Sequence, residues 1–258
     1  MIKKKYDNLE ARIYDSRREM GEAAARDVAA AIREVLGRKE ECRMIFAAAP
    51  SQNEVLAALA ADDSIRWECV RAFHMDEYCG LDADAPQAFG NFLDRALFSH
   101  VPLKAVHYLR DGGHTPEEIC LNYAALLERY PADIVCLGIG ENGHIAFNDP
   151  PVADFADKKL VKVVALDQVC RQQQVNDGCF SSLEEVPAYA VTLTVPALCR
   201  GEKLFCVVPG TLKADAVRKT CEGAVGESCP ATALRMHGGA ILYLDQDSAA
   251  GLAGSPQR

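Results

Sequence analysis

Strand-like and helical segments alternate along this chain, and this alternation limits the possible folds more than any other feature. Helical spacing of apolar residues runs from Ser16 to Gly37, with Ser16 and Glu19 in a capping-box pattern. Further helices are expected after Ser51 and over 115–130 and 211–223, and strands over 44–48, 67–75, 132–140, 189–198, 203–210 and 239–245. The alternation predicts a mostly parallel sheet with helices on both faces. Because no repeat or linker interrupts it, we expect a single α/β domain over residues 1–258.

Composition and charge exclude several classes of protein. A chain of 258 residues with 49% hydrophobic content can bury a sizeable core. The formal net charge is −9 and the basic residues are scattered, so nucleic acid is not an expected partner. No apolar run approaches the roughly 20 residues that span a bilayer, so no membrane role is expected. The polar tail over 248–258 is expected to be mobile.

The eleven cysteines show no C-x-x-C pair, and no apolar signal segment opens the chain. We therefore interpret them as reduced thiols of a cytoplasmic protein, several of them on buried strands. No pair of His or Cys residues has the spacing of a metal site. The sequence predicts neither a metal nor a cofactor.

Four polar stretches follow strand-like segments, and in an open parallel sheet such stretches form the ligand site. The stretch after 44–48 contains Ser51, and the stretch after 203–208 contains Thr211 and Lys213. Hydroxyls, a lysine and backbone N–H groups at a helix start suit an anion such as phosphate. The alternative is that Ser51 and Thr211 only cap their helices and that Lys213 is a solvated surface residue.

A second stretch places Asp76 and Glu77 where a strand is expected to end, beside apolar Phe73 and Met75. A carboxyl that is partly shielded from water there has a raised pKa and can act as a general base. The alternative is a helix cap or a surface pair of acids.

The segment from Gly138 to Pro151 begins with the G-x-G-x-x-G pattern of dinucleotide-binding turns. A crossover helix should follow those glycines, but Asn148-Asp149-Pro150-Pro151 interrupts after a few residues. We therefore reject a nucleotide and expect the glycines to let the backbone approach a small substrate, with His144 as the reactive group. Glu141, Asn142 and Asp149 are near enough in sequence to orient its ring.

Two of these motifs together resemble a known family. The segment 75–81, MDEYCGL, followed by GIGENGHIAFNDPP at 138–151 is similar to the paired signature of glucosamine-6-phosphate deaminases. The segments VPGTLKADAV and AAAPSQNEVLAAL take the places of that family's phosphate lysine and phosphate loop. The resemblance implies a Rossmann-like sheet without a nucleotide, and an enzyme that opens an amino-sugar phosphate, isomerises it from aldose to ketose and releases ammonia.

The resemblance also assigns roles to residues. It implies that Asp76 moves a proton between C2 and C1 and that His144 assists ring opening. The predicted catalytic residues are Asp76, His144, Asp149, Asn142 and Glu141. The predicted substrate and phosphate contacts are Ser51, Gln52, Glu77, Gly138, Gly140, Arg171 and Lys213. The expected partner is a small phosphorylated sugar; members of the family often form homo-oligomers, but the sequence contains no interface signature.

The chain departs from the family pattern at several positions. Asn142 stands where an aspartate is usual, and Asp149 where a glutamate is usual. The phosphate loop lacks the usual glycines, and Arg171 is the nearest match to a second phosphate arginine, at a shifted position. Two alternatives therefore stay open: a sugar-phosphate-binding protein that has lost catalysis, and a hydrolase of the related 6-phosphogluconolactonase type. The latter type usually has D-E-R where this chain has D-E-Y.

Overall fold

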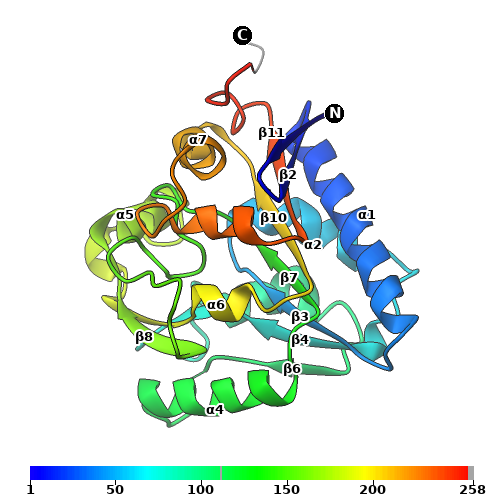
Figure 1. Cartoon of the computed structure of the whole chain (residues 1–258). Helices are drawn as coiled ribbons and strands as arrows, with labels where there is room; N and C mark the ends of the chain where they lie inside the picture. Colours follow the sequence, from blue (N-terminus) through cyan, green and yellow to red (C-terminus); the bar gives the residue numbers. More distant parts are fainter. Residues whose placement is uncertain (111, 255–258) are drawn as a thin grey trace.

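A central eight-stranded sheet is the main feature of the computed structural model, which describes residues 1–110 and 112–254 (Figure 1). Its strand order is β1-β2-β11-β10-β7-β3-β4-β6, and every neighbouring pair is parallel except β1 with β2. The strands are β1 (Ile2–Tyr6), β2 (Leu9–Tyr14), β3 (Cys42–Phe46), β4 (Val70–His74), β6 (Ala105–His107), β7 (Ile134–Leu137), β10 (Lys203–Val208) and β11 (Ala240–Asp245). The prediction of a mostly parallel sheet is confirmed.

Helices cover both faces of this sheet, as predicted. They are α1 (Arg17–Leu36), α2 (Asn53–Ala60), α3 (Phe89–Leu93), α4 (Pro116–Arg129), α5 (Gln168–Asn176), α6 (Val195–Leu198) and α7 (Ala214–Glu222). The buried sides of α1 and α2 belong to one hydrophobic core, and those of α4, α6 and α7 to the other. None of the described helices is long and apolar enough to cross a membrane.

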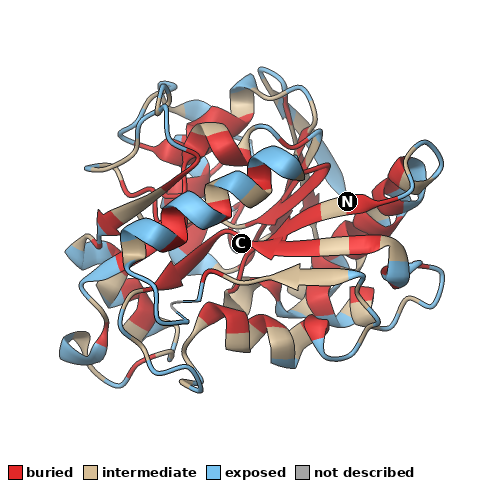
Figure 2. Cartoon of the chain, turned by 90° about the horizontal axis from the view of Figure 1, so that it is seen from below, coloured by how far each residue is buried: buried red, intermediate tan, exposed pale blue. Residues whose placement is uncertain are grey.

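Side-chain alternation along the central strands produces these two cores. In β7, Val135 and Leu137 point into one core, whereas Ile134 and Cys136 point into the other. Such a strand is apolar at every position because helices cover both of its faces. Figure 2 shows the result as buried strands enclosed by helices whose outer sides are exposed.

Two helix starts follow from their capping residues. Ser16 has extended backbone angles, and its hydroxyl accepts a hydrogen bond from the N–H of Glu19, so α1 begins at the predicted position. Thr115 and Glu118 form a complete capping box at the start of α4. These contacts satisfy N–H groups that the first helical turn leaves without partners.

The structure differs from the sequence prediction at several places. The strands β1, β2 and β6 and the helices α3 and α5 were not predicted. Residues 76–78 are not a loop but the strand β5 (Asp76–Tyr78), in a second, antiparallel sheet of order β5-β9-β8 with β9 (Tyr189–Leu193) and β8 (Val161–Ala165). The expected strand over 189–198 ends early because Pro196, in the first turn of α6, suits a helix start. In the tail, Ser248 and Leu252 are buried, and residues 255–258 lie outside the described residues.

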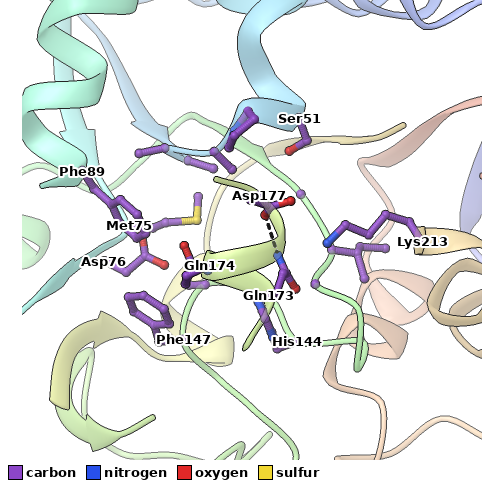
Figure 3. Close-up of a pocket in the computed structure, with 18 of the residues that line it drawn as sticks. Ser51, Met75, Asp76, Phe89, His144, Phe147, Gln173, Gln174, Asp177 and Lys213 are labelled. Atoms are coloured by element: carbon purple, nitrogen blue, oxygen red, sulfur yellow. Dashed lines mark hydrogen bonds between the residues drawn. The ribbon is translucent and has the colours of Figure 1, made fainter. Parts of the chain in front are cut away.

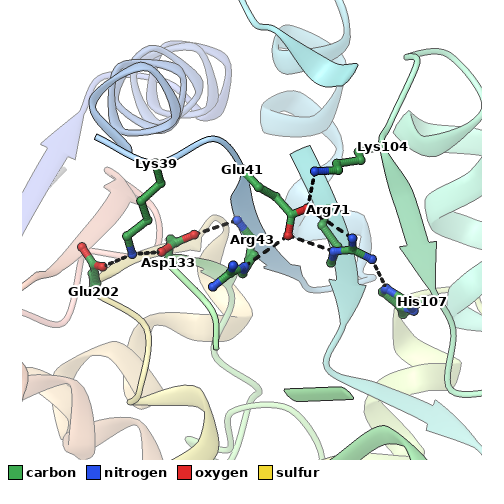
Figure 4. Close-up of polar contacts among 8 residues, drawn as sticks. All are labelled: Lys39, Glu41, Arg43, Arg71, Lys104, His107, Asp133 and Glu202. Atoms are coloured by element: carbon green, nitrogen blue, oxygen red, sulfur yellow. Dashed lines mark hydrogen bonds and ion pairs between the residues drawn. The ribbon is translucent and has the colours of Figure 1, made fainter. Parts of the chain in front are cut away.

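A network of ion pairs lies at the amino ends of the parallel strands (Figure 4). Glu41, immediately before β3, accepts hydrogen bonds or ion pairs from Arg43, Arg71 and Lys104. Asp133, immediately before β7, is paired with Lys39, which also contacts Glu202 before β10. The carboxylates at this end of the sheet therefore have cationic partners.

Candidate active site

A polar pocket lies at the opposite, carboxyl ends of the strands (Figure 3). Segments that follow β3, β4, β7 and β10 all contribute to its wall, as the strand-end rule predicts. Of the predicted residues, the pocket is lined by Ser51, Asp76, Gly138, Gly140, His144 and Lys213. The sequence therefore identified residues on all four of the converging segments.

Asp76 lies in the pocket wall with only 7% of its surface exposed. Burial raises the pKa of its carboxyl well above the usual range, and the neighbouring Glu77 raises it further. Within the described parts of the chain, no group donates a hydrogen bond that would lower this pKa again. The side chain is thus a buried carboxyl that faces a cavity and has a raised proton affinity.

The backbone at Asp76 is fixed from two sides. His74 is fully buried, with its Nδ1 2.9 Å from the carbonyl oxygen of Asp76, and its Nε2 accepts a hydrogen bond from the N–H of Leu109. Burial lowers the pKa of His74 to about 4, so the ring is neutral and Nδ1 carries the proton. On the other side, Asp76 is paired with Thr192 of β9. These contacts determine the direction of the Asp76 side chain.

His144 is held by the polar residues of its own loop. Its Nδ1 lies 2.8 Å from Asn142 Oδ1 and 2.9 Å from Asp149 Oδ1. The Asn142 amide nitrogen donates to the same Asp149 oxygen at 2.8 Å, which fixes the amide orientation. Because both neighbours of Nδ1 are acceptors, Nδ1 carries the proton in the neutral ring, and Nε2 is left as an acceptor. Asn142 and Asp149 support His144 from behind and do not line the pocket themselves.

Asp149 is itself almost completely buried. Burial alone would raise the pKa of its carboxyl, but the contact with His144 reverses this, so its pKa is lowered. Among the described residues its second oxygen, Oδ2, has no N–H or O–H partner, and the Cys170 thiol donates to this carboxylate. A buried, ionised carboxylate therefore faces the inner nitrogen of the histidine.

Close packing explains the glycines of this loop. A Cβ on Gly140 would lie 2.1–2.4 Å from ring atoms of His144, so only glycine leaves room for the ring. Gly143 has a φ of +86°, and a Cβ there would meet the Cys229 sulfur at 2.5 Å. Ala146 also has a positive φ of 48°, a conformation that an L-residue seldom adopts without support from its surroundings. The loop is therefore shaped around the histidine.

Lys213 enters the pocket from the side opposite Asp76 (Figure 3). Its side chain is buried, its Nζ has no hydrogen-bond partner, and burial lowers the pKa of the ammonium group. Ser51 lines the same pocket from a short helical turn that precedes α2. An anion that contacts Lys213 would supply the missing partner.

Four of the predicted residues do not line this pocket and lie among other groups instead. The Gln52 amide donates to the carbonyl oxygens of Leu137 and Val207 and so links the ends of β7 and β10. Glu77 accepts from the N–H groups of Tyr78, Phe89 and Gly90, so it holds the start of α3. Arg171 donates to the carbonyl oxygens of Leu183 and Val186. Glu141 is inside the loop, and one of its carboxylate oxygens has no partner.

Sequence reasoning missed several residues of the pocket wall. They are Arg17, Met75, Phe89, Phe147, Gln173, Gln174 and Asp177. Gln173 and Gln174 belong to α5, a helix that was not predicted from the sequence, and Asp177 directly follows it. Arg17 gives no signal either, since it is merely the first residue of α1.

Comparison with known proteins agrees with this geometry. The family model for glucosamine-6-phosphate isomerases/6-phosphogluconolactonase matches residues 15–243. The chain belongs to this family. The chain is 30% identical over 219 residues to a glucosamine-6-phosphate deaminase of Bacillus thuringiensis (strain Al Hakam), and the match covers 84% of this chain and 80% of that protein. The same values hold for the glucosamine-6-phosphate deaminase of Bacillus cereus (strain AH820).

Solved structures of the same family have the same fold. A monomeric glucosamine-6-phosphate deaminase superposes with a TM-score of 0.84 at 26% identity, covering 93% of this chain and 99% of that one. A 6-phosphogluconolactonase from Thermotoga maritima superposes with a TM-score of 0.75 at 18% identity, covering 92% and 99%. The second likeness shows the fold alone.

Proposed function

We propose that this protein converts glucosamine 6-phosphate, or a closely related amino-sugar 6-phosphate, to the ketose 6-phosphate and ammonia. One observation carries the proposal: a single pocket contains a buried carboxyl without a partner, a histidine held at its inner nitrogen and a buried lysine without a partner. The 30% identity to glucosamine-6-phosphate deaminases supports the same activity.

The arrangement suits the steps of this reaction. His144 would act at the ring oxygen and the C1 hydroxyl, because its Nε2 is free to exchange a proton while Asn142 and Asp149 hold Nδ1. In the open-chain sugar, Asp76 would remove the proton from C2 and return it to C1. Water would then add at C2, and ammonia would leave from the same carbon, which forms the ketone. A raised pKa makes Asp76 a stronger proton acceptor for this step.

The 6-phosphate would lie between Lys213 and the Ser51 turn. Arg17 also lines the pocket; its guanidinium donates to the carbonyl oxygen of Pro50 and is paired with Glu54, and it would add a second cation, in place of the role predicted for Arg171. A bound phosphate would give Lys213 Nζ its missing partner and raise its pKa back toward the usual value. The predicted roles of Glu141, Gly138 and a cytoplasmic location stay predictions.

Tyr78 supports deamination over lactone hydrolysis. By its resemblance to the two branches of the family, the chain has tyrosine where 6-phosphogluconolactonases usually have arginine. Tyr78 is buried, and its hydroxyl donates to Gln174 Oε1 at 2.7 Å, beside the pocket. An uncharged residue there gives no extra cation to the carboxylate that lactone hydrolysis forms.

The test is an activity panel with purified full-length protein. Ammonia and ketose phosphate are measured with glucosamine 6-phosphate and galactosamine 6-phosphate, and hydrolysis with 6-phosphogluconolactone. We expect turnover of an amino-sugar phosphate, and Asp76→Asn should lower kcat by about 10²- to 10⁴-fold without loss of thermal stability. Asp82→Asn, which changes an exposed carboxylate a few residues away, is the matched control.

Three outcomes would contradict the proposal in different ways. Binding of sugar phosphates without any turnover would identify a binding protein that has lost catalysis. Turnover of the lactone alone would identify a hydrolase. Full activity of Asp76→Asn would remove Asp76 from the proton transfer.

A further inference from the structure

Cys170 of α5 lies against the supporting side of His144, although the two are 26 positions apart in sequence. Ligand atoms of His144, Asp149 and Cys170 all lie within 4.8 Å of one another, and all three residues are buried. Spacing along the sequence could not reveal this group, because the thiol comes from a helix and the other two residues from a loop. It lies directly behind the proposed catalytic histidine.

The three donors are the set that zinc prefers. An imidazole nitrogen, a carboxylate oxygen and a thiolate sulfur bind Zn²⁺ at about 2.0–2.3 Å, which separates ligand atoms in a tetrahedral site by roughly 3.3–3.8 Å. His144 Nδ1 and Asp149 Oδ1 are 2.9 Å apart, so a small outward shift would admit an ion between them. Asn142 Oδ1, 2.8 Å from the same nitrogen, or a water molecule could fill the fourth position.

The hydrogen bonding of Asp149 points to the same conclusion. Among the described residues no N–H or O–H group contacts Asp149 Oδ2, although Asp149 is only 1% exposed, and the Cys170 thiol donates to this carboxylate. A thiol is a weak donor, so a cation would be a stronger partner for this buried carboxylate. The Cys170 thiol is fully buried beside it, and burial together with Asp149 raises the pKa of this thiol well above the usual range. The thiol is therefore protonated until a metal displaces its proton.

We propose that His144, Asp149 and Cys170 form an inhibitory binding site for Zn²⁺ or a similarly thiophilic divalent cation. Binding releases the thiol proton to solvent and moves the imidazole proton from Nδ1 to Nε2, because the ion takes the Nδ1 lone pair. Nε2 then carries a proton and has no lone pair to accept another, so the ring can no longer take a proton from a substrate. The inhibition, though not the binding, rests on the proposed function.

Binding is tested without reference to catalysis. Co²⁺ is titrated into the full-length protein, and a thiolate-to-cobalt charge-transfer band is recorded in the near ultraviolet; Zn²⁺ should displace the cobalt and abolish the band. We expect Cys170→Ala to lose this band and to weaken Zn²⁺ binding at least tenfold in calorimetry. Cys179→Ala removes a neighbouring thiol outside the cluster and controls for the other cysteines. Cys170→Ser, which keeps the size of the side chain, tests the same point if the alanine variant folds poorly.

Inhibition is tested in the deaminase assay. Zn²⁺ should inhibit the wild-type protein at concentrations at which Mg²⁺, a cation that prefers oxygen ligands, has no effect. The inhibition constant should rise at least tenfold in Cys170→Ala and stay unchanged in Cys179→Ala, each compared with its own rate without metal. Equal bands and equal Zn²⁺ affinities in wild type and Cys170→Ala would overturn the proposal. If no substrate is turned over, the cobalt titration still decides the metal site, so the two proposals can fail separately.

Discussion

Charged residues at the amino ends of the central strands have partners of opposite charge, whereas Asp76 and Lys213 at the carboxyl ends form no ion pair among the described residues. At the amino ends, Glu41 is surrounded by Arg43, Arg71 and Lys104, and hydrogen bonds from these cations lower its pKa to about 2 although burial alone would raise it. At the carboxyl ends, Lys213 is buried without a partner, and Asp76 is buried beside another acid. Both regions consist of residues that flank the same strands.

This difference separates stability from function. A buried charge without a partner destabilises the folded chain, so it persists where a ligand supplies the missing interaction. A buried charge that already has partners needs no ligand, and its contacts contribute to the stability of the fold. We therefore expect substitutions at the carboxyl ends to change kinetics, and substitutions at the amino ends to change the free energy of unfolding.

The largest effect should come from crowding the histidine at the carboxyl ends. In Gly140→Ala the new methyl group would overlap the His144 ring, so the ring must leave the position in which Asn142 and Asp149 hold it. We expect kcat to fall by about 10²- to 10⁴-fold, which is the usual contribution of a general acid or base. The affinity for a sugar phosphate, measured by calorimetry, should change little, because the atoms nearest to the new methyl group belong to the His144 ring and not to Lys213, the proposed phosphate contact.

Gly226→Ala is the matched control, since a Cβ there meets no atom within 4 Å. If the two variants were equally active, the tight fit between Gly140 and the ring would have no catalytic meaning. A large fall in thermal stability of Gly140→Ala alone would mean that the loop, rather than the ring, had moved.

Lys213→Met should have a smaller effect: it should weaken substrate binding and stabilise the protein without ligand. Lys213→Met keeps the aliphatic stem but removes a buried ammonium without a partner. KM for the sugar phosphate should rise about 10- to 100-fold, because a hydrogen bond to a charged group is worth about 1.5–3 kcal/mol. The free energy of unfolding without ligand should increase by about 1–3 kcal/mol. Lys219→Met, on the exposed side of α7, should change neither quantity.

A Lys213→Met variant that is less stable than the wild type would show that the lysine is part of the stabilising charge network after all. The contrast between the two ends of the sheet would then not hold.

The smallest effect on activity should come from the amino ends. Glu41→Gln leaves three cations without their carboxylate, and we expect a loss of about 1–3 kcal/mol in the free energy of unfolding, between the values of exposed and buried pairs. The kcat/KM ratio of the folded protein should not change. Glu68→Gln, which breaks an exposed pair with Arg66, should cost less than about 0.5 kcal/mol in denaturant titrations.

The pH dependence of this loss has a definite sign. The pKa of Glu41 is lowered from 4.5 to about 2 in the folded state, so its stabilisation is fully present above about pH 4.5 and is lost as the pH falls toward 2. The difference between wild type and Glu41→Gln should therefore shrink over this interval. A difference that stayed constant down to pH 2 would mean that the carboxylate charge is not what stabilises this end of the sheet.

Much of the fold and part of the site could be predicted from the sequence. Long helices, buried strands and their caps are local features, and Asp76, His144 and Lys213 were found because each follows a strand. Of the second sheet, β9 was predicted within a longer strand, but β5 and β8 were missed because three to five residues form a strand only when a neighbour pairs with them.

The differences between the predicted site residues and the residues that line the pocket have a different physical cause. Gln52 and Arg171 carry side chains that can bind phosphate, but each donates to backbone carbonyls that the sequence does not bring near. Arg17 and the glutamines of α5 enter the pocket from elements with no motif of their own. A sequence can therefore suggest that a polar side chain lines a pocket, but it cannot show that the side chain bonds elsewhere, because the tertiary structure decides which other groups are near enough to bond with it.

The strand β9 anchors two parts of the pocket wall. Thr192 pairs with Asp76, and its hydroxyl also accepts from the N–H of Phe147, while the amide of Asn148 donates to the carbonyl oxygen of Leu193. The proton-transfer carboxyl and the histidine loop are thus anchored to one strand and must move together. Helix α5 is tied to the same side, because Gln173 accepts from the N–H of Glu141 and Gln174 accepts from the Tyr78 hydroxyl. A widening of the pocket that admits a substrate would therefore come from the Ser51 turn and Lys213, which have no bond to β9 among the described contacts.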